Sequence, residues 1–428
     1  MSKPALLPVD EARSAIIDSL SAVSVEQLTP DAAHHRYLAA DISASLDHPA
    51  AAVSAMDGYC LASSDKDALS SKGLKIIGES AAGRPFTQPL GQGEAVRIFT
   101  GALLPQNADM LLIQEEAALT SGRLMATETP VAGRYIRQRA QDFASGDQLI
   151  SAGTKLTMRH LALAALAGIT SLTCHRRPRI AIATTGDELV PPGQTPLPGQ
   201  LVNSNSLFLT HFVRAAGAEP VELGILPDQA GALHAALSSA GPLDLIVTTG
   251  GASVGDHDHI VSDLDSDPAS SLNFWKIAMR PGKPLIWANW RGTPFLGLPG
   301  NPVSAAICAL QFLGPAIDRL SGGTGQIGTG QISSGQIASG QIASGQIGGF
   351  FKAKLTTDLP ENDQRQDYLR ATLTHDSDGT ALVTPANRQD SAMMHKLALA
   401  DCLIIRPPFA EPLSAGAWVE CQAFPAGF

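Results

Sequence analysis

A glycine-rich turn with two carboxylates behind it is the stretch of this sequence best suited to chemistry. Gly250, Gly251 and Gly255 follow a short apolar run, and Asp256 and Asp258 come just downstream. Paired glycines allow positive φ and let backbone N–H groups approach a ligand closely, while carboxylates are the hard oxygen ligands that Mg²⁺ prefers. The combination suits a phosphate-bearing substrate. A plain glycine turn between a strand and a helix would use the same residues.

A second acidic cluster follows another buried apolar run. Asp187 and Glu188 come directly after Gly186, just past residues 180–183. If the two runs are neighbouring strands, their acidic ends repel each other unless they share a cation. The sequence therefore predicts a metal site that uses Asp187, Glu188 and Asp258.

Basic groups gather in one short stretch of a chain whose formal net charge is −10. Lys276, Arg280 and Lys283 lie on a predicted strand and on the Pro-Gly turn that ends it, so rigid backbone presents their charges. Arginine suits an oxyanion bidentately, and lysine acts as a point charge. Ser304 follows in the first turn of a predicted helix, where free N–H groups favour anions. A proline-containing helix cap explains that last segment equally well.

Two motif matches compete with this interpretation. The run from Gly251 to Gly255 matches G-x-S-x-G, which would make Ser253 the nucleophile of an α/β-hydrolase. That serine would need a base and an acid, and the following carboxylates are better placed to hold a cation. The glycine pattern at 323–328 resembles a dinucleotide fingerprint, but no strand precedes it, so we discard it.

The elements that must position these groups alternate between strand and helix. Strands are predicted at 180–183, 221–225 and 245–247, and helices at about 204–216 and 229–240. This order predicts a doubly wound, mostly parallel, three-layer α/β domain at 178–320. Ligands of such sheets lie at the carboxyl ends of the strands, which is where both acidic clusters fall.

The rest of the chain predicts three further parts and a tether. Residues 1–50 and 146–177 are predicted to form a discontinuous helical domain whose helices at 9–20 and 157–168 pack together. An inserted small β domain is predicted at 51–145, and a C-terminal β-barrel-like domain at 350–428. Gly-Gln-Ile recurs five times at a five-residue period in 321–349. That segment predicts a flexible linker.

Composition excludes several classes of protein. The net charge of −10 argues against nucleic-acid binding. We found no apolar run of about 18 residues and no signal-peptide layout, so we expect no membrane association and a cytoplasmic location. Five widely spaced cysteines without a C-x-x-C indicate buried thiols.

Taken together, six motifs resemble one family in order along nearly the whole chain. They are Ser-Ala-Met-Asp-Gly-Tyr at 54–59, Thr-Gly-Ala at 100–102, Thr-Gly-Asp-Glu-Leu at 185–189, Gly-Gly-x-Ser-x-Gly at 250–255, Pro-Gly-Lys-Pro at 281–284 and Leu-Pro-Gly-Asn-Pro-Val-Ser at 298–304. The chain resembles the molybdopterin molybdenumtransferases, whose animal relative is the E domain of gephyrin.

The resemblance implies an activity and a set of site residues. The expected reaction uses adenylylated molybdopterin, molybdate and Mg²⁺ to give molybdenum cofactor and AMP, in a homodimer whose active site lies at the protomer interface. Molybdopterin adenylyltransferase and molybdoenzyme acceptors are possible partners. By this resemblance the catalytic residues are Asp57, Thr100, Asp142, Asp187, Glu188 and Asp258. Pterin, AMP and pyrophosphate would contact Gly250, Gly251, Ser253, Gly255, Asp228, Lys276, Pro299 and Asn301. Molybdate would sit among Arg280, Lys283, Ser304, Arg365 and Ser391.

Departures from the family pattern and two rivals remain. Arg280 stands where many relatives have lysine, and Asp390 precedes Ser391 where glycine is common. A carboxylate beside a dianion is unfavourable unless it points away. A molybdopterin adenylyltransferase would share the α/β domain but lack the two β domains. A non-catalytic molybdopterin-binding scaffold would keep the fold and could lose the acids.

Overall fold

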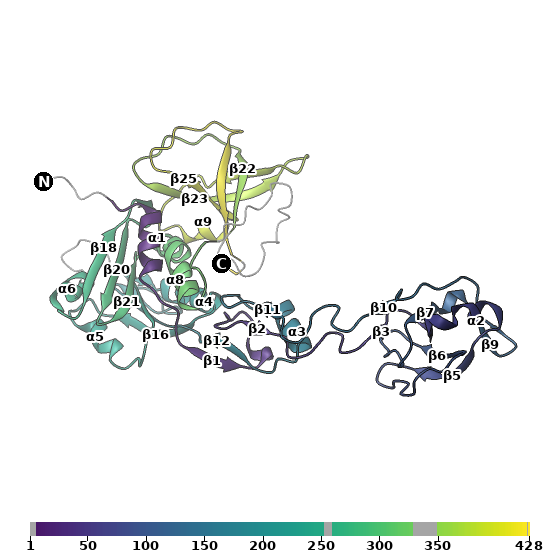
Figure 1. Cartoon of the computed structure of the whole chain (residues 1–428). Helices are drawn as coiled ribbons and strands as arrows, with labels where there is room; N and C mark the ends of the chain where they lie inside the picture. Colours follow the sequence, from purple (N-terminus) through teal and green to yellow (C-terminus); the bar gives the residue numbers. More distant parts are fainter. Residues whose placement is uncertain (1–5, 252–258, 328–348, 426) are drawn as a thin grey trace.

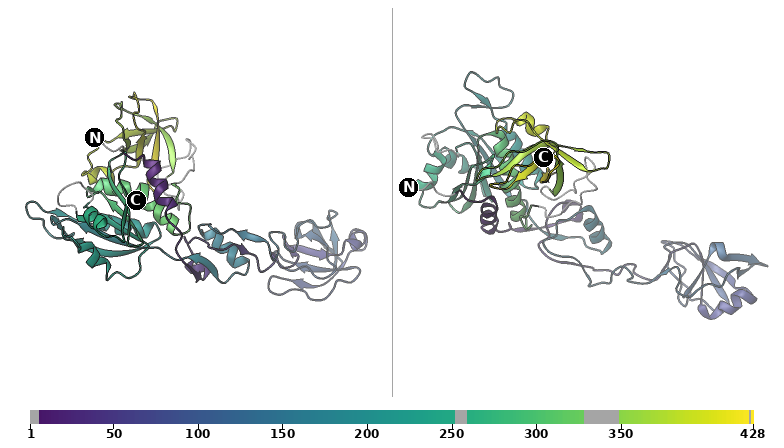
Figure 2. Two further views of the ribbon diagram at one scale, coloured as in Figure 1. Left: turned by 60° about the vertical axis from the view of Figure 1, so that its left-hand side comes forward. Right: turned by 90° about the horizontal axis from the view of Figure 1, so that it is seen from above.

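The protein is elongated. The computed structural model describes residues 6–251, 259–327, 349–425 and 427–428. Figure 1 shows the α/β domain and the C-terminal domain together at one end and the inserted β domain at the other. A smaller folded part of the N-terminal region lies between them, and a thin stretch of extended chain leads from it to the inserted domain; the two views of Figure 2 agree.

The α/β domain is built on a six-stranded sheet in the order β16-β13-β17-β21-β20-β18. Its parallel part consists of β16 (Glu219–Leu226), β13 (Arg179–Thr185), β17 (Leu245–Thr249) and β21 (Thr293–Leu298). The antiparallel edge consists of β20 (Pro284–Trp290) and β18 (Ser271–Lys276). The predicted mostly parallel sheet is confirmed, and β13 and β17, which precede the two acidic clusters, are direct neighbours.

Helices cover both faces of this sheet. Ile180 and Ile182 of β13 join a core with α1 (Val9–Asp18), α4 (Asn205–Ala215) and the helix at 302–320, while Ala181 and Ala183 face α5 (Ala232–Leu237) and α6 (His259–Ser266). Successive strand residues point to opposite faces, so two apolar layers need the continuous apolar run that β13 has. The three-layer prediction is confirmed.

One long apolar helix runs through the centre of the molecule. It comprises α7 (Pro302–Cys308), a π-helical segment (Ala309–Leu313) and α8 (Gly314–Leu320). By length and composition it is the one helix in the described ranges able to cross a membrane, but 89% of it is buried inside the protein, which is typical of a core helix. Within it, Gln311 accepts from Arg13 of α1 at 3.0 Å and donates to Gln422 at 2.6 Å, which ties the helix to two other elements.

The discontinuous N-terminal domain contains more strand than we expected. It pairs β1 (Val25–Leu28) with β12 (Leu172–His175) and β2 (Ile42–Ser43) with β11 (Gln148–Ile150), around α3 (Met158–Leu166) and the 3-10 turn η1 (Pro30–Ala32). The helix α1 buries its apolar face against α8 and not with α3, which has a separate core. Periodicity identifies a buried face but not the element that covers it.

The inserted domain is a small sheet with one helix. Its strands follow the order β5-β6-β4-β7, with β4 (Gly58–Leu61), β5 (Lys75–Ser80), β6 (Glu94–Ile98) and β7 (Met110–Ile113). A hairpin of β8 (Ala117–Thr120) and β9 (Arg123–Ala126) and the short helix α2 (Lys66–Ser71) complete it, with β3 (Val53–Ser54) and β10 (Ile136–Arg137) at its base. The sequence did not indicate α2, because six residues are too few for a clear helical period.

The C-terminal domain is a closed barrel. Its five strands are β22 (Phe350–Leu355), β23 (Gln366–His375), β24 (Ala381–Pro385), β25 (Cys402–Arg406) and β26 (Trp418–Ala423), and pairing of β23 with β25 closes the ring. The short strand β19 (Met279–Arg280) of the basic stretch pairs in parallel with β23, which joins this domain to the α/β domain. The five cysteines are buried free thiols, as predicted.

Candidate active-site cleft

A cleft of about 580 Å³ lies at the carboxyl ends of β13, β17 and β21. In the sheet, β17 lies between β13 and β21, and Figure 1 shows β21 and β16 of the same sheet in the α/β domain. The predicted residues that line it are Glu188, Gly250, Gly251, Pro299, Asn301 and Ser304. Its volume is in the range of small-molecule sites, and its position is the one that parallel sheets favour for ligands.

The glycine turn is required by close packing as well as by its backbone angles. Gly250 and Gly251 have φ values of +88° and +61°. A Cβ at Gly250 would lie 2.4 Å from the carbonyl oxygen of Thr185, and one at Gly251 would lie 2.8 Å from Cδ1 of Ile260. Any other residue would therefore force the end of β13 away from β17. The hydroxyl of Thr185 beside this turn is buried and has no hydrogen-bond partner among the described residues.

Two asparagines that we did not predict fix the walls of the cleft. Asn203 donates to the hydroxyl of Thr184 at 2.8 Å, and Asn205 donates to the hydroxyl of Thr249 and to the carbonyl of Gly300, both at 2.8 Å. Both asparagines line the cleft, after β14 (Leu189–Val190) and β15 (Leu201–Val202). Asparagine is common at helix starts, so the Asn-Ser-Asn run gives no sign of these contacts in the sequence.

The predicted acidic residues divide between the cleft and its edge. Glu188 lines the cleft. Asp187 and Asp228 lie beside it and exchange hydrogen bonds, because the backbone N–H of each donates to the carboxylate of the other, at 3.4 and 3.1 Å. Among the described residues, no three His, Cys, Asp or Glu side chains form a group that could hold a metal ion.

Several predicted site residues fall outside the described part of the chain or away from the cleft. Ser253, Gly255, Asp256 and Asp258 lie outside the described residues. Lys276 ends β18, where its carbonyl accepts from the backbone N–H of Leu7 at 3.2 Å.

The start of α7 brings two predicted serines and the basic turn together. Ser304 is buried and lines the cleft, and the backbone N–H of Val303 donates to the carbonyl of Ser391 at 3.1 Å. Gly282 packs so closely on α7 that a Cβ there would lie 2.5 Å from Sγ of Cys308. Lys283 directly precedes Pro284, which lines the cleft. The lysine is exposed and pairs with no carboxylate in the described ranges.

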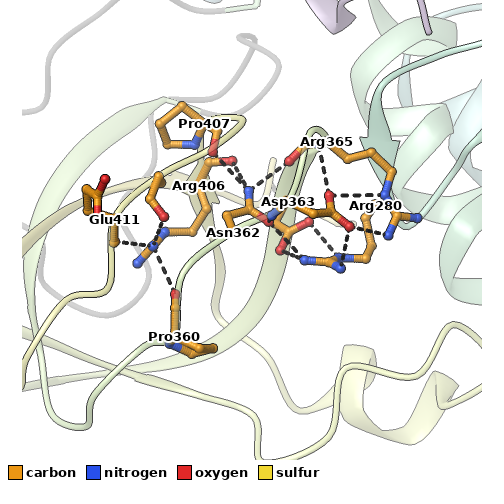
Figure 3. Close-up of polar contacts among 10 residues, drawn as sticks. Arg280, Pro360, Asn362, Asp363, Arg365, Arg406, Pro407 and Glu411 are labelled. Carbon is orange, nitrogen blue, oxygen red and sulfur yellow. Dashed lines mark hydrogen bonds and ion pairs between the residues drawn. The ribbon is translucent and has the colours of Figure 1, made fainter. Parts of the chain in front are cut away.

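The two predicted arginines lie in a separate cluster where the α/β domain meets the barrel (Figure 3). Arg280 donates to Asp367 through Nε at 2.7 Å and also through Nη2, and Arg365 donates to Asp363 at 2.6 Å. The hydrogen bond from Arg280 to Asp367 raises the pKa of the guanidinium. The guanidinium of Arg365 lowers the pKa of Asp363 to about 2. Both arginines thus already have carboxylate partners.

The remaining predicted residues belong to the inserted β domain and its connection. Asp57 accepts from the backbone N–H of Thr100 at 2.8 Å and from its hydroxyl at 2.9 Å. These two bonds, the backbone one first, lower the pKa of Asp57. Asp142 lies in the extended connection, where its N–H donates to the carbonyl of His48 at 3.0 Å. The structure does not bring these residues to the cleft of the same chain, because their domain lies at the other end of the molecule (Figure 1).

Three family models match successive parts of the chain. Residues 7–168 match the MoeA N-terminal region (domains I and II), residues 181–319 match a probable molybdopterin binding domain, and residues 352–424 match the MoeA C-terminal region (domain IV). Residues 320–351, between the second and third matches, include the Gly-Gln-Ile repeat.

Curated relatives and solved structures agree with these matches. A molybdopterin molybdenumtransferase of Haemophilus influenzae is 31% identical over 422 residues, covering 98% of this chain and 99% of the relative. One of Nostoc is 37% identical over 298 residues, covering 68% of each. The crystal structure of a molybdopterin biosynthesis MoeA protein of Pyrococcus horikoshii superposes with a TM-score of 0.80 at 26% identity, over 98% of this chain and 99% of that one.

Proposed function

The chain belongs to the molybdopterin molybdenumtransferase family, and we propose that it acts on adenylylated molybdopterin, using molybdate and Mg²⁺ and releasing AMP. It is a transferase that inserts molybdenum into molybdopterin. The observation that carries the finer proposal is the cleft of about 580 Å³ at the carboxyl ends of β13, β17 and β21, inside the region that matches a molybdopterin-binding model.

The cleft offers groups that suit a pyrophosphate-linked pterin. The tight Gly250–Gly251 turn lets backbone approach a phosphate, and the unpartnered hydroxyl of Thr185 beside it can donate to an oxygen. The positive end of the long helix at 302–320 favours negative charge, although Pro302 has no N–H and the N–H of Val303 already donates to Ser391. We propose that Pro299 and Asn301 contact the substrate beside them, with Asp228 and Lys276 farther along the edge.

The carboxylates around the cleft fit Mg²⁺. Magnesium binds proteins through one or two carboxylates and keeps waters and substrate phosphates as its other ligands, so it needs no three-residue cluster. Glu188 in the cleft and Asp187 at its edge are the described candidates, and Asp258 remains a sequence-based proposal. A bound Mg²⁺ would neutralise charge on the pyrophosphate.

Molybdate would bind next to this cleft. Lys283 supplies a charge without a carboxylate partner in the described ranges, and Ser304 and Ser391 lie at the helix start. Arg280 and Arg365 would complete the site from the barrel side. Because both arginines are paired with carboxylates, Lys283 is the residue whose charge an incoming anion meets first.

We also propose a homodimer in which Asp57, Thr100 and Asp142 act at the partner's cleft. The β domain is too far from its own α/β domain to reach it (Figures 1 and 2). A groove of about 440 Å³ lined by Phe208, His211 and Phe212 of α4, next to Leu207, which is 55% exposed, offers a self-association surface. Contacts with an adenylyltransferase and with molybdoenzymes, a cytoplasmic location and the absence of nucleic-acid partners stay predictions.

The test is a reconstituted reaction. The purified protein is incubated with adenylylated molybdopterin, molybdate and Mg²⁺, and AMP and active cofactor are measured. Both products should require molybdate and Mg²⁺, and Glu188→Gln should lose AMP release at limiting Mg²⁺, because an amide oxygen is a poorer ligand than a carboxylate. Adenylylation of free molybdopterin by ATP would instead support the adenylyltransferase alternative. Hydrolysis of simple esters that Ser253→Ala abolishes would support the hydrolase alternative.

A further inference from the structure

Both arginines proposed for molybdate are bound by one exposed carboxylate. Oδ2 of Asp363 lies 3.3 Å from Nη1 of Arg280 and 2.6 Å from Nη2 of Arg365, and its Oδ1 lies 3.3 Å from Nε of Arg365. Oδ1 also accepts from the backbone N–H of Arg365 at 2.9 Å. Figure 3 shows Asp363 between the two guanidinium groups. A single side chain therefore occupies the donors that an oxyanion would need.

The second carboxylate of the cluster is held differently. The side chain of Asp367 is 6% exposed, on β23 next to β19, and it takes Nε and Nη2 of Arg280. Asn362 accepts from the same Nη2 at 2.9 Å. These contacts fix one edge of the Arg280 guanidinium, and they leave Nη1 facing Asp363, whose side chain is 45% exposed.

The net charge of this cluster determines how strongly it attracts an incoming anion. The charges of the two guanidinium groups and the two carboxylates cancel, so these four side chains give a dianion little attraction while Asp363 stays in place. Arg406, whose charge interacts with Asp367, adds one further positive charge on the barrel side. The side chain of Asp363 can turn out to solvent without moving the loop, because its carbonyl is held separately by the backbone N–H of Phe409 at 2.7 Å. Once it turns out, Arg280 and Arg365 outweigh Asp367 and present converging donors.

We propose that Asp363 is a displaceable carboxylate that occupies the oxyanion-binding groups of Arg280 and Arg365 until a tetrahedral dianion such as molybdate takes its place. This inference rests on the proposed function for the location of the molybdate site. Exchange of one anion for another keeps the arginines paired in both states, and it weakens the binding of every oxyanion by the same factor. The low pKa of Asp363 keeps the competing group ionised at neutral pH.

The test measures binding of molybdate itself. Radiolabelled molybdate is equilibrated by dialysis at low ionic strength with the full-length wild-type protein and with Asp363→Asn. The asparagine oxygen can still accept from the backbone N–H of Arg365 but no longer carries the competing charge. We expect Asp363→Asn to bind molybdate about fivefold more tightly, the equivalent of ~1 kcal/mol for a half-exposed ion pair, and to bind sulfate more tightly by a similar factor.

Two further variants distinguish a wrong role for Asp363 from a wrong position for the oxyanion site. Asp378→Asn changes the net charge equally in an exposed loop of the same domain, where its carboxylate accepts a hydrogen bond only from Ser377 among the described residues, and it should bind molybdate as the wild type does. Arg365→Gln should lose most of the binding. If Arg365→Gln loses it and Asp363→Asn binds no better than wild type, the site stands and the displaceable carboxylate is wrong. If Arg365→Gln binds normally, or no protein retains molybdate, the proposed oxyanion site and this inference both fail.

Discussion

The cleft of the α/β domain and the Asp57–Thr100 pair of the β domain hold their polar groups in opposite ways. In the cleft, Asn203 binds the end of β13 and Asn205 links the end of β17 to the turn after β21, and the hydroxyls they bind are buried. Asp57 and Thr100 are exposed at turns of a domain that extends away from the rest of the chain (Figure 1).

The difference indicates which half of the proposed site is complete in one protomer. Buried hydrogen bonds fix the cleft before substrate arrives, which is what a binding site needs for preorganisation. The β-domain pair is ordered locally by its own two hydrogen bonds but has no surface of its own chain to act on. It becomes part of a site only if a second protomer covers it.

The largest expected effect tests this division directly. Asp57→Asn and Glu188→Gln should each be inactive, but an equal mixture co-expressed with two affinity tags should regain about a quarter of wild-type activity, because half of the dimers pair one variant with the other and hold one intact site. Activity is measured as AMP release at limiting Mg²⁺ by the mixed and the separate proteins.

The mixed sample has its own control. Two preparations of Asp57→Asn carrying the two different tags should stay inactive when mixed. A mixture of the two variants that also stays inactive, although the tags show that mixed dimers form, would place Asp57 and Glu188 in the same protomer's site or remove Asp57 from it.

The second largest expected effect tests whether the hydrogen bonds of Asn205 fix the cleft. Asn205→Ala removes both 2.8 Å hydrogen bonds to Thr249 and Gly300 and leaves the buried hydroxyl of Thr249 without its donor. We expect a loss of about 1–3 kcal/mol in the free energy of unfolding and a raised KM for the adenylylated substrate, because the end of β17 and the turn before α7 lose their link. Thermal denaturation and steady-state kinetics measure the two changes.

A matched exposed amide serves as the control for this prediction. Gln148→Ala removes one exposed side-chain hydrogen bond of 3.2 Å to Ser151, far along the chain from the cleft, and should change neither the unfolding free energy nor KM. If Asn205→Ala behaves like Gln148→Ala, the asparagine does not preorganise the cleft.

Features of the fold and of the cleft that depend on one segment of the chain could be predicted from the sequence. The positive φ values of Gly250 and Gly251 follow from residue type, and the position of the cleft follows from the order of strands and helices. The resemblance drawn from six short motifs is confirmed by relatives over 98% of the chain. In each case the physical cause lies within a few residues or in a general rule of sheet topology.

The parts that could not be predicted depend on contacts between distant segments. Arg280 and Asp367 are 87 residues apart, and nothing in either segment shows that β19 joins β23. The helix α1 has the expected apolar face, but its partner α8 lies about three hundred residues further along the chain, a separation that local periodicity does not encode. Asn205 was not predicted, because its bonds to distant segments leave no mark in the sequence.

A smaller effect concerns the β-domain side. The backbone N–H of Thr100, and then its hydroxyl, lower the pKa of Asp57, so removing the hydroxyl in Thr100→Val should raise that pKa while leaving it below its ordinary value. Because the folded-state pKa of Asp57 is depressed, its charged form persists as the pH falls, and the variant should lose that form at a higher pH. NMR titration of the Asp57 carboxyl carbon measures the shift.

Thr100→Ser keeps the hydroxyl and should titrate like the wild type. If Asp57 acts as a carboxylate in the reaction, the acidic limb of the pH–rate profile should move up in Thr100→Val by the same amount as the NMR value. An unchanged pKa in Thr100→Val would mean that the hydroxyl contact does not persist in solution.

The smallest expected effect concerns the Gly-Gln-Ile repeat, which separates the cleft domain from the barrel in sequence. Their junction is fixed by direct contacts, including Arg280 with Asp367 and Gln311 with Gln422, and not by the length of the chain between them. Deleting residues 331–345, which removes three repeats, should change the free energy of unfolding by less than ~1 kcal/mol, because each doubling of loop length costs only about 0.6 kcal/mol. AMP release and thermal denaturation should both stay near wild type.

The first Gly-Gln-Ile repeat, at 325–327, differs from the deleted repeats because it packs against the folded protein. Ile327 is 5% exposed, and the backbone N–H of Gly325 donates to Asp318 of α8 at 3.0 Å. Ile327→Ala should therefore destabilise the protein by about 2 kcal/mol, more than removal of fifteen residues beyond it, because it leaves a cavity in packed structure. A deletion that abolishes activity while Ile327→Ala is silent would reverse this assignment and would mean that the repeat, and not the domain junction, holds the barrel against the cleft.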